Sequence, residues 1–201
     1  MKQKKIYWII SFVLLLLFLV IVSPDFKKEV SETSFKEELS NYESIENRDI
    51  EEDLQLGLLL SNDNQEEKAK SIYLSILKKE PDNEMATHRL AIQAMDDGNL
   101  EESKKYFEKN IKTYPKQVSH YYYYALLFLV EDLDQAGLMM TKAYELSDEE
   151  YKQFYMSWIN IIDSIKWEKQ IGYQNLLSND ELYIPQIIKN QIKDTVSSEK
   201  H

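Results

Sequence analysis

Two prolines impose the strongest constraint on how this chain can fold. Pro81 and Pro115 lie 34 residues apart, and the segments that precede them align without gaps. The matched positions are Leu56-Gly57, Ala69, Tyr73 and Ile76 in the first segment and Leu90-Ala91, Ser103, Phe107 and Asn110 in the second. A fixed period of this length predicts a solenoid, in which copies of one small unit bury their apolar faces against each other.

A third and weaker copy of the unit follows. It carries Tyr124-Ala125, Ala136, Met140 and Ala143, but it is one residue shorter near Asp132 and lacks the closing proline. The small residues let two helices approach closely, the aromatic residues fill the space between units, and each proline ends a helix. The predicted helices span 49–62, 66–80, 84–97, 100–113, 118–131 and 133–146.

These residues resemble the tetratricopeptide repeat family, whose repeats are pairs of antiparallel helices. The first copy matches the family pattern closely, the second substitutes Ala91 and Ser103 at small positions, and Gly98 falls in the turn between two helices. Only four glycines and four prolines occur in 201 residues, too few for a protein rich in β-turns. The predicted fold class is all-α, a helical-hairpin solenoid of about three repeats over residues 49–147.

The residues after the repeats predict helices that cap the solenoid. Ser147-Asp148-Glu149-Glu150 fits a capping box, and an apolar stripe that starts at Tyr151 predicts a helix over about 148–167. Residues 168–180 are predicted to be a loop, and a last helix is predicted over 181–196 with Pro185 in its first turn. The C-terminal capping helices thus occupy 148–196, followed by a disordered tail at 197–201.

The N-terminal 28 residues predict a membrane anchor. Residues 6–22 form an uncharged and mostly apolar run, which would span about 25 Å as a helix against a hydrocarbon core of about 30 Å. A cleaved signal peptide is the competing interpretation, but no Ala-x-Ala site follows the run. Lys2, Lys4 and Lys5 precede it, which favours an N-terminus inside the cytoplasmic membrane and a body outside, in a bacterial envelope.

Residues 29–48 predict a juxtamembrane linker followed by an amphipathic helix. Ser34-Phe35-Lys36-Glu37 fits a capping box. The apolar stripe that follows consists of Phe35, Leu39, Tyr42 and Ile45. It either docks on the repeat domain or binds a partner or a second copy of the chain.

The family resemblance implies a concave groove lined by the first helix of each repeat. The positions carried over are Leu54, Leu58, Met85, His88, Ile92, Met95, Tyr122, Leu126 and Leu129. This predicted groove is mainly apolar, with His88 and Arg89 as isolated polar groups, and it lacks the Lys and Asn of the carboxylate-clamping members. It is filled either by a protein or peptide segment or by the chain's own helix at 34–47 or 181–196, because exposed apolar grooves favour aggregation.

The four consecutive tyrosines that begin at Tyr121 lie on a predicted helix and therefore point in nearly all directions. Tyr121 and Tyr124 fall at core positions of the repeat. Tyr122 is expected to face the groove, and Tyr123 to face outward.

The composition argues against catalysis and metal binding. There are no cysteines, the three histidines have no metal-ligand spacing, and no nucleotide or hydrolase motif occurs, so we expect no enzyme, cofactor or metal. The formal net charge of −11 would repel nucleic acid. The sequence predicts a membrane-anchored scaffold or adaptor for protein–protein interaction, held to the bilayer by residues 6–22 and assisting secretion or envelope-complex assembly. The alternative is a structural subunit of a larger secretion or pilus machine whose groove is filled internally.

Overall fold

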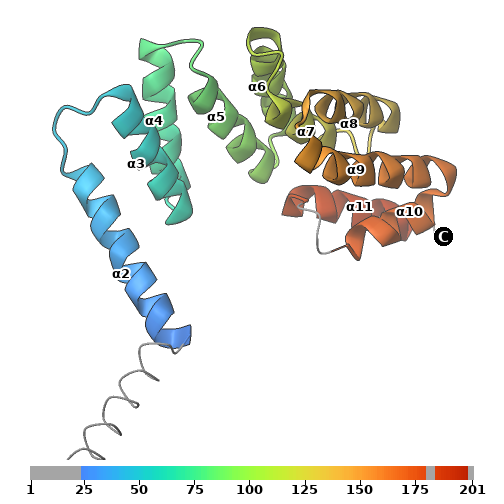
Figure 1. The fold of residues 1–201 in the computed structure, drawn as a ribbon, viewed down its shortest axis with the longest axis horizontal. Helices are drawn as coiled ribbons and strands as arrows, with labels where there is room; N and C mark the ends of the chain where they lie inside the picture. The colour runs from blue at the N-terminus through green and yellow to red at the C-terminus, as the bar shows by residue number, and fades with distance from the viewer. Residues whose placement is uncertain (1–23, 180–183, 199–201) are drawn as a thin grey trace, which may run out of the picture.

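The computed structural model describes residues 24–179 and 184–198. These residues form helices joined by short turns, in an arc of antiparallel pairs (Figure 1). The predicted membrane span at 6–22 lies outside the described residues. Within them, no helix combines the length and the apolar character needed to cross a bilayer.

The six helices predicted for the repeats are present. They are α3 (Ile50–Asn62), α4 (Glu66–Lys79), α5 (Glu84–Asp96), α6 (Leu100–Thr113), α7 (Val118–Leu126) and α8 (Leu133–Leu146). Each odd-numbered helix packs against the even-numbered helix that follows it. The prediction of helix up to residue 131 in the third repeat is wrong, because α7 ends at Leu126. The next amides bond three residues back, as in Phe128 N–H to the Ala125 carbonyl at 3.1 Å, and so form tight turns that absorb the missing residue.

The repeat positions act as the period predicts. A Cβ added at Gly57 would lie 2.6 Å from the ring of Tyr73, so α3 and α4 approach more closely than any larger residue allows. Tyr73 and Phe107 are buried between helices. Ser103 also has a bonding role, since its hydroxyl donates to the Ala91 carbonyl at 2.8 Å and ties α6 to α5.

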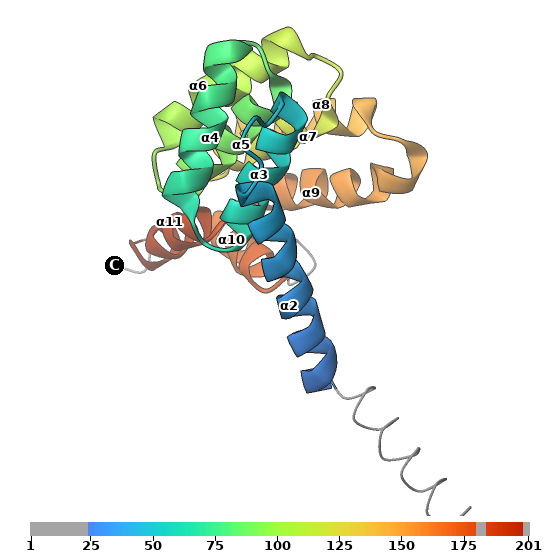
Figure 2. The same ribbon diagram turned by 90° about the vertical axis from the view of Figure 1, so that its left-hand side faces the viewer.

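Helix α2 (Pro24–Glu43) begins ten residues before the predicted capping box, so that predicted start at Ser34 is wrong. Pro24 is tolerated at a helix start because its missing N–H has no partner there in any case. Phe35, Leu39 and Tyr42 pack against the core between α3 and α4, which confirms docking of the stripe. Ile45 lies beyond the helix. In both views, α2 extends away from the repeats (Figures 1 and 2).

Arg48 fastens the turn between α2 and α3. Its guanidinium donates to the Ile45 carbonyl at 3.0 Å and to the Asp53 carboxylate at 2.9 Å. The same carboxylate, which is buried, accepts from Lys79 of α4 at 3.1 Å. A buried charge paired on both sides in this way joins the turn, α3 and α4.

The C-terminal segment contains three helices, α9 (Glu149–Trp167), α10 (Lys169–Leu177) and α11 (Gln186–Ser198). The predicted loop at 168–180 is wrong because α10 forms and packs on α9. Gly172 allows this contact, since a Cβ there would lie 2.5 Å from the Ile165 backbone. The predicted capping box at the start of α9 is not made, because the Ser147 hydroxyl donates to the Tyr144 carbonyl and Asp148, which precedes the helix, forms no side-chain capping bond. Helix α11 starts directly after Pro185.

Candidate functional site: a half-open groove

Eight of the nine predicted groove residues lie on α3, α5 and α7, the first helices of the three repeats, and Leu129 lies in the turns that follow α7. They differ sharply in exposure. Met85 is 48% exposed, and Leu54, Leu58, His88 and Ile92 are partly exposed. The other four are buried, with Tyr122 at 7% and Met95, Leu126 and Leu129 at 0%. Only the part of the groove formed by α3 and the start of α5 presents side chains to a partner.

Helix α11 closes the other part of the groove. Its Ile188 and Ile192 share one buried cluster with Leu126 of α7 and Leu129 just after it. The hydroxyl of Tyr173, in α10, donates to the Leu129 carbonyl at 2.7 Å. In Figure 1, α11 and α10 lie together beneath α7 and α9 on the inner side of the arc. Of the two interpretations left open by the sequence, filling by the chain's own helices therefore applies to the four buried residues, and the other five remain available to a partner.

Tyr122 and Tyr123 show how the aromatic run is used. Tyr122 packs edge-on against Trp158 of α9, with ring centroids 5.9 Å apart. Tyr123 stacks on Phe107 at 6.0 Å and meets the ring of His88 at 5.4 Å. The expectation that Tyr123 points outward is wrong, since it fills the space between the second and third repeats.

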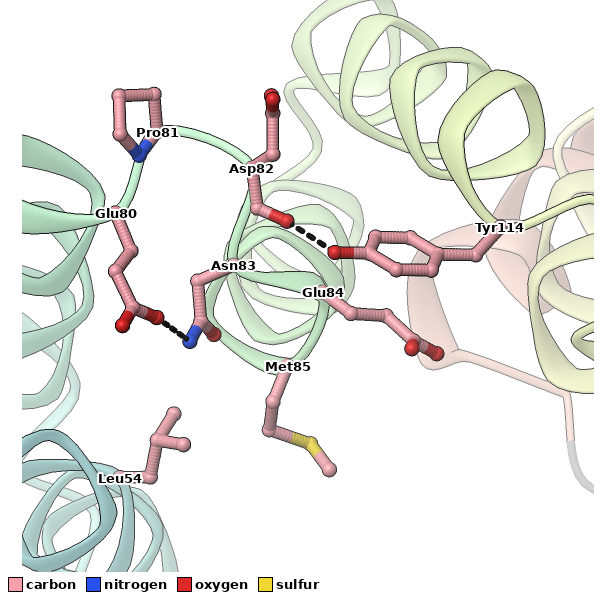
Figure 3. Close-up of a pocket in the computed structure, with 8 residues that line it drawn as sticks. All are labelled: Leu54, Glu80, Pro81, Asp82, Asn83, Glu84, Met85 and Tyr114. Carbon is pink, nitrogen blue, oxygen red and sulfur yellow. Dashed lines mark hydrogen bonds between the residues drawn. The ribbon is translucent and has the colours of Figure 1, made fainter.

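A pocket of about 560 Å³ opens at the end of the exposed part. Leu54 and Met85 supply its apolar wall, and the turn from Glu80 to Glu84, with Tyr114, supplies its polar rim (Figure 3). The turn is held in place by its own bonds. Asn83 donates to the Glu80 carboxylate at 2.9 Å and accepts from the Ala86 amide as the cap of α5.

A second cavity of about 400 Å³ adjoins the first along the next turn. It shares Glu84 and Tyr114 with the first pocket and is otherwise lined by residues 113–117. The Tyr114 hydroxyl donates to the Asp82 carbonyl at 2.6 Å, which fixes the wall between the two cavities. The rim of the first pocket carries three carboxylates, from Glu80, Asp82 and Glu84. The open part of the groove is therefore apolar at its floor and acidic along one edge.

The sequence argument missed a buried histidine pair beneath this edge. The Nδ1 atoms of His88 and His120 lie 3.1 Å apart, and Nε2 of His120 lies 3.1 Å from a Glu84 carboxylate oxygen. Burial lowers the pKa of His88 to about 3, with further lowering from His120 and Arg89. Burial also lowers the pKa of His120, against the opposing effect of Glu84. His88 is thus part of a bonded cluster and is not the isolated group that was predicted.

A spacing argument could have found this pair. His88 and His120 lie within the first two turns of the first helices of two successive repeats, and such helices lie next to each other in a solenoid. Within the described part of the chain, no three His, Asp or Glu side chains converge as metal ligands. The arrangement offers an apolar surface, an acidic edge and a buried proton-binding pair.

Comparisons with known proteins place the fold. No protein-family model matches the sequence, and no curated protein matches it significantly. Among solved structures, "MamA RS-1 ArsTM double mutant" superposes with a TM-score of 0.59 at 18% identity, over 85% of this chain and 92% of that one. "MamA 41-end from Desulfovibrio magneticus RS-1" gives 0.58 at 17% identity, over 87% and 93%.

The fold is a tetratricopeptide-type solenoid. The matched share of the chain exceeds the half that the three predicted repeats occupy, so helices outside the repeats also have counterparts in MamA. The superposition shows a shared architecture, but identities this low do not show a shared activity. The activity of each chain must be argued from its own side chains. In this chain, the candidate side chains are those that line the open half of the groove.

Proposed function

We propose that this protein is a scaffold that binds a segment of another protein in the open half of its groove, which is formed by Leu54, Leu58 and Met85. A tetratricopeptide-type fold is suited to protein–protein interaction, because stacked repeats build an extended concave surface. The observation that carries the proposal is the contrast within one groove. The chain covers the half near α7 with its own helices and leaves apolar side chains exposed in the other half.

The chemistry of the open half favours an amphipathic segment. Met85 offers a soft, adaptable side chain that can pack against partners of different shape, and the adjoining pocket of about 560 Å³ can take one large side chain. Residues 6–22 would anchor this scaffold in the cytoplasmic membrane with the repeats on the outer side. Anchoring would raise the effective concentration of the scaffold near membrane-bound or secreted partners.

Site-specific crosslinking in membranes tests the binding site. A photo-crosslinking residue at Met85 of the full-length chain should capture one partner, which mass spectrometry identifies. The same residue at Leu138, which is 60% exposed on α8 outside the groove, is the matched control and should not capture that protein. Equal capture at both positions would reject the groove as the site.

Charge substitution then tests the role of the apolar floor. In the chain that carries the crosslinking residue at position 85, Leu58→Glu with Ile92→Glu should abolish the crosslink, since a carboxylate in an apolar contact costs several kcal/mol, about 2–5, unless it is paired. The helical melt of the variant should be unchanged because both side chains are solvent-accessible in the free protein. Leu138→Glu should leave capture intact.

The anchor and its direction need a separate test. A reporter that is active only in the cytoplasm, fused after His201, should be silent if the repeats lie outside. Activity of that reporter would overturn the outer location. It would not test whether the groove binds a partner.

One observation favours the alternative of a structural subunit in a larger envelope machine. Helix α11 already fills half of the groove, as expected of a chain that uses this surface for its own stability. Crosslinks from Met85 to several components of one purified complex would support that alternative over a scaffold with a single partner.

A further inference from the structure

Glu84 connects the open groove with the buried histidine pair. Its carboxylate lines both cavities at the groove edge and also bonds His120 at 3.1 Å. His120 is only 1% exposed and bonds His88 in turn. The chain Glu84–His120–His88 therefore runs from the surface of the candidate site into the interface between the second and third repeats.

The geometry limits how many protons this chain can hold. Two Nδ1 atoms 3.1 Å apart accommodate one proton between them, since one ring must donate and the other accept. A neutral pair satisfies this condition when His120 donates Nε2–H to Glu84 and accepts from His88 at Nδ1. A singly charged pair also satisfies it, with His120 as the cation. A second added proton would place two N–H groups against each other.

The surroundings oppose extra positive charge. Helix α5 contributes Arg89, whose positive charge acts on His88, and Glu84, the carboxylate that bonds His120. Helix α7 contributes Tyr123, and α6 contributes Phe107, which does not titrate. The two aromatic rings meet His88 edge-on and cover part of its ring. Glu84 alone can therefore balance one positive charge, and nothing comparable balances a second.

We propose that the His88–His120 pair is an acid-sensitive joint between the second and third repeats, which holds the Glu84 edge of the groove in place at neutral pH and releases it in mild acid. This inference rests on the proposed function in one respect: it takes the Glu84 edge of the groove to be part of a binding site. The joint itself is a property of the free chain.

The sign of the pH effect follows from linkage. An unfolded histidine has a pKa of about 6.5, whereas burial lowers the pKa of both His88 and His120 in the folded chain. The unfolded chain therefore binds more protons below pH 6.5. The stabilisation is fully present above that value and is lost as the pH falls below it. Acid should thus favour opening of the joint.

The small number of histidines makes the pH dependence of stability easy to assign. The chain contains three histidines, and two of them form this pair, so few other side chains change charge between pH 5 and 8. Urea unfolding of the full-length chain in a mild nonionic detergent should show the folded-to-unfolded ratio falling between pH 7.5 and 5.5. The expected loss is about tenfold if the folded pair accepts one of its two protons, and about a hundredfold if it accepts neither.

Two variants isolate the pair. His88→Phe with His120→Phe replaces both partners by rings of similar shape, which leaves no buried polar group unpaired and should remove the excess loss. His201→Asn should keep the wild-type pH dependence. The inference is overturned if the double variant loses as much stability in acid as the wild type does.

A measurement on the unmodified chain guards against a double variant that does not fold. A proton NMR titration compares the three histidine ring signals with the midpoint of a free histidine, about 6.5, and the signal lost in His201→Asn is that of His201. At least one of the other two histidines should not titrate until far lower pH. Three midpoints near 6.5 would overturn the joint. Neither readout uses a partner, so a failed partner search leaves this test intact.

Discussion

The two halves of the groove are built from the same repeat positions yet present opposite surfaces. Leu58 in the first repeat and Leu126 in the third occupy equivalent places on their helices, but Leu58 is partly exposed and Leu126 is fully buried. The difference comes from the C-terminal helices, because Ile188 and Ile192 of α11 share the buried cluster of Leu126, whereas α2, which contacts α3, leaves Leu58 partly exposed. The repeat period therefore determines where the groove runs, while an element outside the repeats determines which part of it stays open.

The two halves also differ in how their helices start. In the open half, Asp49 and Asn83 cap α3 and α5 through side-chain bonds to backbone amides. In the closed half, Gln117 and Asp148 precede α7 and α9 without such bonds. Helices α7 and α9 therefore depend more on burial against other helices than α3 and α5 do. The contrast does not extend to the second helices of the repeats, since Asp132 caps α8 and no side chain caps α4 or α6.

The largest expected effect comes from removing the cover of the closed half. Ile192→Ala should lower the free energy of unfolding by about 2–5 kcal/mol, as is usual for a large-to-small change at a fully buried site. Leu58→Ala in the open half should cost less than about 1 kcal/mol, because its side chain already contacts water. Urea denaturation of both variants measures the difference. Equal losses would mean that α11 does not bury the closed half in solution.

The repeats are the part of the fold that the sequence predicts best. Pro81 and Pro115 mark the period, and every predicted repeat helix is present, with five of the six ending within one residue of prediction. The errors lie where tertiary contacts override local patterns. Residues 169–177 have a weak amphipathic pattern, and α10 forms there because Gly172 lets it approach α9 closely.

The site could be predicted only in part. The family resemblance places the groove on the right helices, but exposure depends on where α11 folds back, and no local pattern in residues 186–198 specifies its neighbour. The histidine pair joins residues 32 positions apart, His88 and His120. Spacing within one helix cannot reveal such a contact, whereas the offset between successive repeats can.

Close helix contacts give a second test of the comparison. Gly172→Ala in the closed half would place a methyl group 2.5 Å from the Ile165 backbone, which cannot move without shifting α9. Gly57→Ala in the open half would meet the Tyr73 ring at 2.6 Å, and the far end of a side chain can shift more easily than a backbone can. Overpacking costs about 1–3 kcal/mol, so we expect Gly172→Ala near the top of this range and Gly57→Ala near the bottom.

Thermal unfolding followed by circular dichroism, with both variants in the same buffer, ranks these two contacts. A larger loss for Gly57→Ala than for Gly172→Ala would reverse the expected order. The first pair of helices would then be the more tightly constrained one, and the view of the open half as the more tolerant half would be incorrect.

The smallest effect concerns the helix caps. Asp49 accepts from the Glu52 amide at 2.8 Å, and the Glu52 carboxylate accepts from the Asp49 amide at 2.9 Å, so Asp49→Ala removes one bond of a complete capping box. The expected loss is about 1 kcal/mol. Asp148→Ala at the start of α9 is the matched control and should change stability by less than about 0.5 kcal/mol, because its side chain makes no capping bond. A loss of similar size in both variants would show that a cap also stabilises α9 in solution, and local stabilisation would then no longer distinguish the open half from the closed half.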